Sequence, residues 1–193
     1  MADILNILLV GVGGQGTILA AKVLATAALA QGLDVKMSEI HGMAQRGGSV
    51  ITHVRVGEKV FSPLVESGEA DIIVAFEELE ALRYAHYLRP GGIIIVNQRQ
   101  IPPLPVVIGA APYPQEVTGK LAAYGQVQVI AAEELAGQAG NPRGANLVLL
   151  GALAARLPWA LADWEAAIQA RVPARFLESN LTAFQLGFAK NVD

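Results

Sequence analysis

The sequence contains no cysteine, and this absence excludes several kinds of chemistry at once. Without a thiol the chain cannot form a disulfide, hold a thiolate zinc site, supply a cysteine nucleophile or ligate an iron–sulfur cluster. Charged residues are also scarce, at 16% of 193 residues, and the net charge is −3 with no block of lysine or arginine. A nucleic-acid-binding protein needs such a block to neutralise phosphates, so no nucleic-acid partner is expected.

Neither a membrane span nor a leader is expected, although 53% of the residues are hydrophobic. The most apolar stretch, residues 18–30, is interrupted by Lys22 and Thr26 and falls short of the ~18 apolar residues of a spanning helix. The N-terminus lacks the basic stretch of a signal peptide, so we expect a cytoplasmic protein that does not enter the membrane. The apolar excess then indicates an interface, and it favours a homodimer of the isolated chain when its partner is absent.

Familiar catalytic and metal-binding motifs are missing as well. The chain has no G-x-S-x-G elbow, no H-E-x-x-H pair and no Walker sequence. Its three histidines do not have the spacing of metal ligands: His41, His53 and His86. The acidic cluster of Glu77, Glu78 and Glu80 is interpreted as a solvated helix face. No catalytic residue or metal site is therefore assigned to this chain, and its chemistry is expected to depend on another subunit.

The order of apolar segments predicts an α/β fold. Residues 4–10 form a predicted strand that ends in a glycine loop, residues 17–31 a helix and residues 33–39 a second, parallel strand. Residues 49–56 alternate in polarity and are predicted to form an inserted β-hairpin with residues 59–62. These segments predict a Rossmann-like domain with a mostly parallel sheet that the hairpin makes mixed.

The second half of the chain continues this pattern and ends in helices. Five prolines between residues 101 and 114 leave room only for a short edge strand at residues 106–109. Further strands are predicted at residues 71–76, 93–97 and 126–131, and further helices at 77–88, 114–124, 133–139, 145–157, 160–171 and 174–190. We therefore expect one Rossmann-like domain over residues 1–157 and a helical extension, residues 158–193, packed on it.

The glycine loop at residues 11–16 reads GVGGQG and fits the pattern G-x-G-x-x-G. Between a strand and a helix, such a loop can hold a phosphate on backbone N–H groups at the positive end of the helix dipole. The alternative is that the glycines only permit a tight turn. Glu39, at the end of the second predicted strand, is placed to bind a ribose, so a stand-alone NAD- or FAD-binding protein is a second hypothesis.

Two further segments carry polar groups in unusual settings. The segment EIHGMAQRGGSV at residues 39–50 suits an anionic ligand or a partner surface, because it combines glycines with imidazole, amide and guanidinium groups. The segment NPRGAN at residues 141–146 offers a guanidinium and amides to a phosphate or carboxylate. An Asx turn followed by a helix cap is the alternative for the second segment.

Together these three segments resemble the gamma-domain family of pyruvate and 2-oxoacid:ferredoxin oxidoreductases, over roughly residues 5–157, and the separate small subunits of the indolepyruvate type in particular. The resemblance implies a complex that oxidatively decarboxylates an aryl 2-oxoacid to an acyl-CoA and reduces ferredoxin. It also implies a large partner subunit that holds thiamine diphosphate, Mg and [4Fe–4S] clusters, because this chain has neither cysteine nor a Gly-Asp-Gly segment. Coenzyme A is the candidate ligand of this chain.

We expect the glycine loop and the segment after Glu39 to form one concave site, with Arg46 as its charged contact. Parallel sheets place ligands beyond the carboxyl ends of their strands, where both segments begin. The expected ligand-binding residues are Gly11, Gly13, Gly14, Gln15, Gly16, Thr17, Glu39, His41, Gln45, Arg46, Gly47, Asn141, Arg143 and Asn146.

Overall fold

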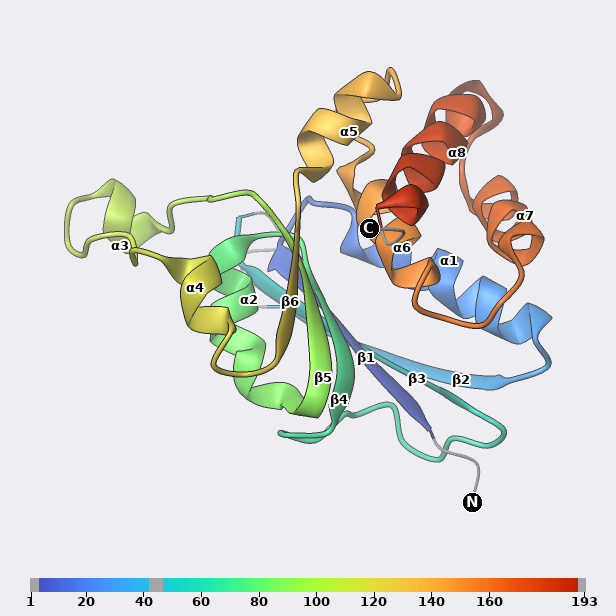
Figure 1. Cartoon of the computed structure of the whole chain (residues 1–193), viewed down its shortest axis with the longest axis horizontal. Coiled ribbons are helices and arrows are strands. Elements are labelled where there is room, and N and C mark those ends of the chain that lie inside the picture. Colours follow the sequence, from blue (N-terminus) through green and yellow to red (C-terminus); the bar gives the residue numbers. More distant parts are fainter. Residues whose placement is uncertain (1–3, 42–46, 191–193) are drawn as a thin grey trace.

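A six-stranded mixed sheet forms the centre of the structure, a computed structural model that describes residues 4–41 and 47–190 (Figure 1). The strand order is β2-β3-β1-β4-β5-β6, and the ladders β1–β4, β4–β5 and β5–β6 are parallel. The strands are β1 (Leu5–Val12), β2 (Asp34–His41), β3 (Ser49–Gly57), β4 (Ala70–Ala75), β5 (Leu88–Asn97) and β6 (Gln126–Ile130). The α/β class and the mostly parallel, mixed sheet predicted from the sequence are confirmed.

β3 lies between β1 and β2 and is antiparallel to both. The predicted hairpin partner was wrong, because residues 59–62 form no strand and β3 pairs with β2 instead. β3 is buried along most of its length, so pairing on both sides satisfies its backbone groups, which a position at the sheet edge would not do. As a result β1 and β2 run in the same direction but are not neighbours.

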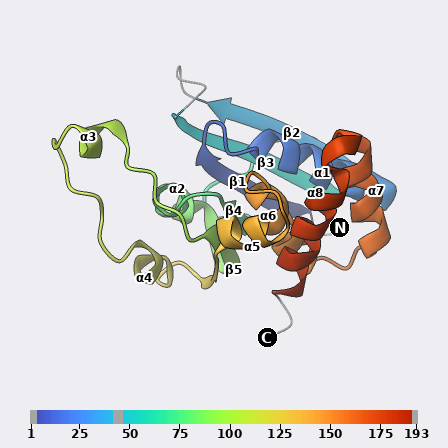
Figure 2. The same cartoon turned by 90° about the horizontal axis from the view of Figure 1, so that it is seen from above.

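Helices cover both faces of the sheet (Figures 1 and 2). On one face lie α1 (Thr17–Ala30), α5 (Ala132–Gln138), α6 (Ala145–Ala154), α7 (Leu161–Arg171) and α8 (Ala174–Ala189). The other face carries α2 (Glu78–Tyr84), the 3₁₀ helix η1 (Ala85–Tyr87) and α4 (Val117–Leu121). Side chains of a strand alternate between faces, so Ile7 and Leu9 pack under the first group of helices while Leu8 and Val10 pack under the second.

The C-terminal helix α8 packs against α6 at unusually short range. A Cβ atom on Gly187 would lie 1.9 Å from the carbonyl oxygen of Val148, and one on Gly151 would lie 2.0 Å from that of Phe184. The two backbones therefore touch, and only glycine fits at either position.

In the residues that the structure describes, no helix is long and apolar enough to cross a membrane.

On the other face of the sheet, the carboxylate of Glu77 caps the N-terminus of α2. It accepts hydrogen bonds from the backbone N–H of Glu80 at 2.9 Å, from that of Ile101 at 3.0 Å and from the Tyr113 hydroxyl at 2.8 Å. Burial and the neighbouring Glu77 raise the pKa of Tyr113, so this hydroxyl stays a donor. Glu78 is buried as well. The predicted solvated face was therefore wrong, because these carboxylates have partners inside the fold.

Two other buried polar groups lie on this face. The carboxylate of Glu80 accepts hydrogen bonds from the Ser49 hydroxyl and from Arg83 Nε. The imidazole of His53 is buried in β3, and its Nδ1 accepts a hydrogen bond from the backbone N–H of Val65 at 3.1 Å. Burial lowers the pKa of His53, so the neutral ring is favoured.

Residues 101–113, which we call the proline arm, extend from the sheet between β5 and α4 (Figure 2). The arm contains α3 (Leu104–Val107), so the predicted edge strand at residues 106–109 was wrong. Proline suits the first turn of a helix, where its missing N–H costs nothing, and this explains a helix in so proline-rich a segment. The tip of the arm exposes Leu104, Val107 and Ile108 at 70%, 69% and 68% of their surfaces. These three side chains are called the apolar apex below.

Candidate functional site

The glycine loop after β1 requires glycine for its backbone geometry. Gly14 and Gly16 have φ angles of +105° and +82°, a region in which other residues are strained. A Cβ atom on Gly11 would lie 2.8 Å from Gln15 Oε1 and 2.9 Å from Phe76 Cβ. The loop therefore passes close to the end of β4 before it enters α1.

The side chain of Gln15 holds this loop in place. Its Oε1 accepts a hydrogen bond from the backbone N–H of Val12 at 2.7 Å, and its Nε2 donates to the carbonyl oxygen of Phe76 at 2.8 Å. On the other side of the loop, Gly13 N–H donates to the carbonyl oxygen of Gly48 at 2.8 Å. Gln15, an expected ligand contact, thus joins the ends of β1 and β4.

The loop also contacts the first turn of α6, which the sequence analysis did not predict. Asn146 is buried and its Nδ2 donates to the carbonyl oxygen of Gly16 at 3.3 Å. A Cβ atom on Gly16 would lie 2.6 Å from the same nitrogen. Asn141 Oδ1 accepts from the backbone N–H of Arg143 at 3.3 Å, as in an Asx turn. Two segments far apart in the sequence therefore form one surface.

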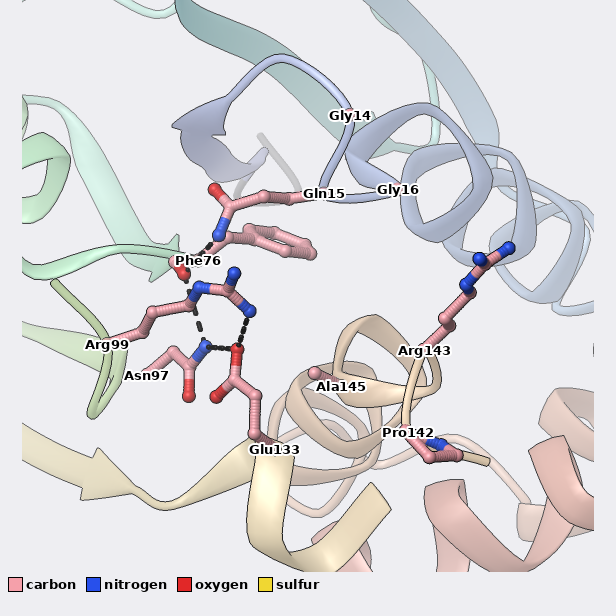
Figure 3. Close-up of a pocket in the computed structure, with 10 residues that line it drawn as sticks. All are labelled: Gly14, Gln15, Gly16, Phe76, Asn97, Arg99, Glu133, Pro142, Arg143 and Ala145. Carbon is pink, nitrogen blue, oxygen red and sulfur yellow. Dashed lines mark hydrogen bonds and ion pairs between the residues drawn. The ribbon is translucent and has the colours of Figure 1, made fainter. Parts of the chain in front are cut away.

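A pocket of about 300 Å³ lies where these segments meet (Figure 3). Its lining consists of Gly14, Gln15, Gly16, Phe76, Asn97, Arg99, Glu133, Pro142, Arg143 and Ala145. Both α1 and α6 begin at this pocket, and neither has an acidic residue in its first turn. The first N–H groups of a helix have no acceptor within the helix and lie at its positive end. The pocket is therefore suited to an anion.

The pocket has an arginine on each side. Arg143 stands on the turn before α6, and Arg99 follows β5 on the opposite side (Figure 3). Arg99 Nη1 lies 2.6 Å from Oε1 of Glu133, which also accepts a hydrogen bond from Asn97 Nδ2 at 3.1 Å. Within the described residues, no group of three or more His, Cys, Asp or Glu side chains is placed to hold a metal ion.

Four of the lining residues lie outside the segments that the sequence analysis singled out. Phe76, Asn97 and Arg99 follow or end parallel strands, and Glu133 begins α5, so no local motif marks them. The available signal was position, because the carboxyl ends of parallel strands meet at one edge of a sheet. Asn97 is the clearest case, since it is a polar residue that directly follows four apolar ones.

The expected site residues on β2 lie on the other side of the glycine loop. Glu39 and His41 line a pocket of about 170 Å³ with Gly13, Gly14 and Thr17. Gly47 lies beside the loop, where its N–H donates to the carbonyl oxygen of Gly13, while Gln45 and Arg46 lie outside the described residues. The structure thus brings the two segments together, but in a pocket that shares only Gly14 with the larger one.

Glu39 does not occupy the position that an NAD site requires. In a dinucleotide-binding fold the acidic residue ends a strand that directly neighbours β1. Here β3 separates β2 from β1, and the Glu39 side chain is exposed at the edge strand.

The chain was compared with known proteins. The family model described as "Pyruvate ferredoxin/flavodoxin oxidoreductase" matches residues 6–190. Indolepyruvate oxidoreductase subunit IorB of Thermococcus kodakarensis is 42% identical over 194 residues, with 94% of this chain and 93% of the relative covered. The same subunit of Archaeoglobus fulgidus is 41% identical over 189 residues, with 95% and 94% covered.

Solved structures give a similar result. The gamma subunit of a keto/oxoacid ferredoxin oxidoreductase from Geobacter sulfurreducens is 28% identical and superposes with a TM-score of 0.73. That superposition covers 96% of this chain and 97% of the solved chain.

Proposed function

Because the chain belongs to the pyruvate ferredoxin/flavodoxin oxidoreductase family, we propose that it is the small subunit of an indolepyruvate:ferredoxin oxidoreductase. Such a complex oxidatively decarboxylates an aryl 2-oxoacid to its acyl-CoA and reduces ferredoxin. The indolepyruvate assignment is supported by 42% identity to a subunit of that name, over nearly the full length of both chains. The hypothesis of a stand-alone NAD- or FAD-binding protein is not favoured.

The redox cofactors belong to a large partner subunit in this proposal. The residues of this chain do not fit a [4Fe–4S] cluster, since the sequence has no cysteine. They do not fit a metal-bound thiamine diphosphate either, since the sequence has no Gly-Asp-Gly segment. We therefore assign thiamine diphosphate, Mg and the clusters to the partner and derive no step through them here.

The contribution of this chain is to bind the phosphates of coenzyme A in the 300 Å³ pocket. The observation that carries this assignment is the convergence of the N-termini of α1 and α6 beside Arg143. A neighbouring pocket of about 540 Å³ shares Pro142 and Arg143 and has apolar side chains such as Phe176 in its lining. The less charged part of the coenzyme extends into this second pocket.

The partner subunit covers the apolar apex of the proline arm. The arm carries no charged residue, and Leu104, Val107 and Ile108 are exposed. Exposed apolar clusters of this kind are typical of protein interfaces. Because the arm leaves the sheet beside Arg99, a partner that covers it also lies next to the pocket.

Steady-state kinetics of the reconstituted complex test the coenzyme A assignment. Arg143→Ala should raise the KM for coenzyme A about tenfold, because a charge-assisted contact to phosphate is lost. The KM values for the 2-oxoacid and ferredoxin should not change. Arg156→Ala is the matched control, since Arg156 is an exposed arginine outside both pockets. Equal KM values for coenzyme A in the two variants would contradict the assignment.

A further inference from the structure

We propose that Arg99 is a second anion-binding residue of the pocket, which Glu133 holds until a phosphate enters and replaces the carboxylate. The inference rests on the proposed function for the identity of the ligand. It concerns a pair of residues that no sequence motif marked, on the side of the pocket opposite Arg143 (Figure 3).

The backbone of Arg99 is fixed, whereas its side chain is half exposed. The N–H of Arg99 donates to the carbonyl oxygen of Asn97 at 2.7 Å, and its carbonyl oxygen accepts from Glu78 N–H at 2.9 Å. The side chains of Arg99 and Glu133 are 46% and 35% exposed. The guanidinium can therefore change partners while its Cα atom stays in place.

The exchange of partners costs the protein little. An ion pair as exposed as Arg99–Glu133 is strongly screened by water and contributes little to stability. A guanidinium and a phosphate form two parallel, charge-assisted hydrogen bonds, which are stronger than a single contact to a carboxylate. A phosphate close to the helix N-termini therefore competes successfully for Arg99.

Glu133 keeps a partner after Arg99 leaves. Asn97 Nδ2 donates to the same Oε1 atom at 3.1 Å, and Asn97 is itself fixed because its Oδ1 accepts from Ala132 N–H at 3.2 Å. The carboxylate thus remains at the edge of the pocket as a fixed negative charge. It repels any anion that enters the pocket, so a bound phosphate must gain more from Arg99 and the helix N-termini than it loses to Glu133.

Three single variants and the double variant Arg99→Ala/Glu133→Gln test this exchange in the reconstituted complex, with the KM for coenzyme A as the readout. Arg99→Ala should raise this KM about tenfold, and Arg99→Lys should restore part of the loss. Glu133→Gln should lower it about threefold, because Arg99 no longer has to leave a carboxylate. In the double variant Glu133→Gln should bring no gain, since no guanidinium is left to release.

Matched controls separate this effect from a change of net charge. Glu134→Gln removes the same charge from the next residue of α5, which lies outside the pocket. Arg89→Ala removes an arginine of similar exposure that pairs with Asp71 at the other end of β5. Neither control should change the KM for coenzyme A.

The possible outcomes distinguish the two proposals. If Arg143→Ala raises the KM but Arg99→Ala and Glu133→Gln do not change it, the exchange is wrong and the coenzyme A assignment stands. A higher KM in Glu133→Gln would also overturn the exchange. If Arg143→Ala has no effect, the coenzyme A assignment fails, and the exchange fails with it.

Discussion

The face of the sheet under α1, α6, α7 and α8 is covered by apolar side chains, whereas the face under α2 and α4 also buries carboxylates and an imidazole. On the first face, helix backbones touch at Gly151 and Gly187. On the second, Glu77 and His53 accept hydrogen bonds from the backbone N–H groups of Ile101 and Val65, which lie in loops. The difference indicates that the first face supplies most of the stability, while the second positions the loops. Four measurements test this division.

The largest loss of stability is expected from Gly187→Ala on the apolar face. The new Cβ atom would overlap the carbonyl oxygen of Val148, so α8 must move away from α6. We expect a loss of about 3 kcal/mol in the free energy of unfolding, measured with urea. Gly137→Ala is the control, because nothing lies within 4 Å of a Cβ atom there and helix propensity favours alanine. Similar losses in both variants would contradict the close packing of α6 and α8.

Glu77→Ala is expected to destabilise the polar face by about 2 kcal/mol, because two N–H groups and the Tyr113 hydroxyl lose a charged acceptor. Tyr113→Phe removes only one of these bonds and should cost about 1 kcal/mol. Hydrogen exchange should accelerate in the proline arm of both variants but not in α6. An unchanged exchange rate in the arm would show that Glu77 does not hold it.

The titration of His53 is expected to change the free energy of unfolding with pH, by less than Glu77→Ala does. Burial lowers its pKa in the folded state, so only the unfolded chain takes up a proton as the pH falls through about 6.5. This contribution to stability is present above that pH and is lost below it. The unfolding free energy should therefore fall less between pH 7.5 and 5.5 in His53→Gln than in the wild type. His86→Gln, at an exposed position, should leave the wild-type dependence unchanged.

The smallest effect on stability is expected at the apolar apex. Leu104→Ser combined with Val107→Ser should change the unfolding free energy by no more than about 0.5 kcal/mol, because both side chains are already exposed. The double variant should nevertheless lose assembly with the large subunit in size-exclusion chromatography. Phe61→Ser, at a position 82% exposed, is the control and should assemble normally. Normal assembly of the apex variant would contradict the proposed docking of the arm.

Local sequence signals predicted the apolar face well and the polar face poorly. The positions of β1, α1, α6, α7 and α8 follow from apolar runs and from the glycines and prolines that end them. The pairing of β3 with β2 could not be predicted from these local signals, because strand pairing depends on which segments meet in space. For Glu77, Glu78 and Glu80, composition indicated solvent, since burial of a carboxylate depends on distant donors such as Tyr113.

The candidate site was predicted in part for the same reason. The glycine loop and the turn before α6 carry recognisable motifs, and the structure places them side by side. The other side of the pocket, with Asn97, Arg99 and Glu133, is assembled from the C-terminal end of β5 and the start of α5. No local motif marks these residues, so the order of the strands in the sheet is needed to show that they face the glycine loop and the turn before α6.

The bonds from Ile101 and Tyr113 to Glu77 make the proline arm a ring that is closed through a single side chain. A protease that cuts the backbone between these two residues would open the arm without separating the halves of the protein. Both new ends would stay attached to the same carboxylate, and the strands on either side would keep their neighbours. The nicked protein should therefore elute as one particle from a native column and give two bands on a denaturing gel.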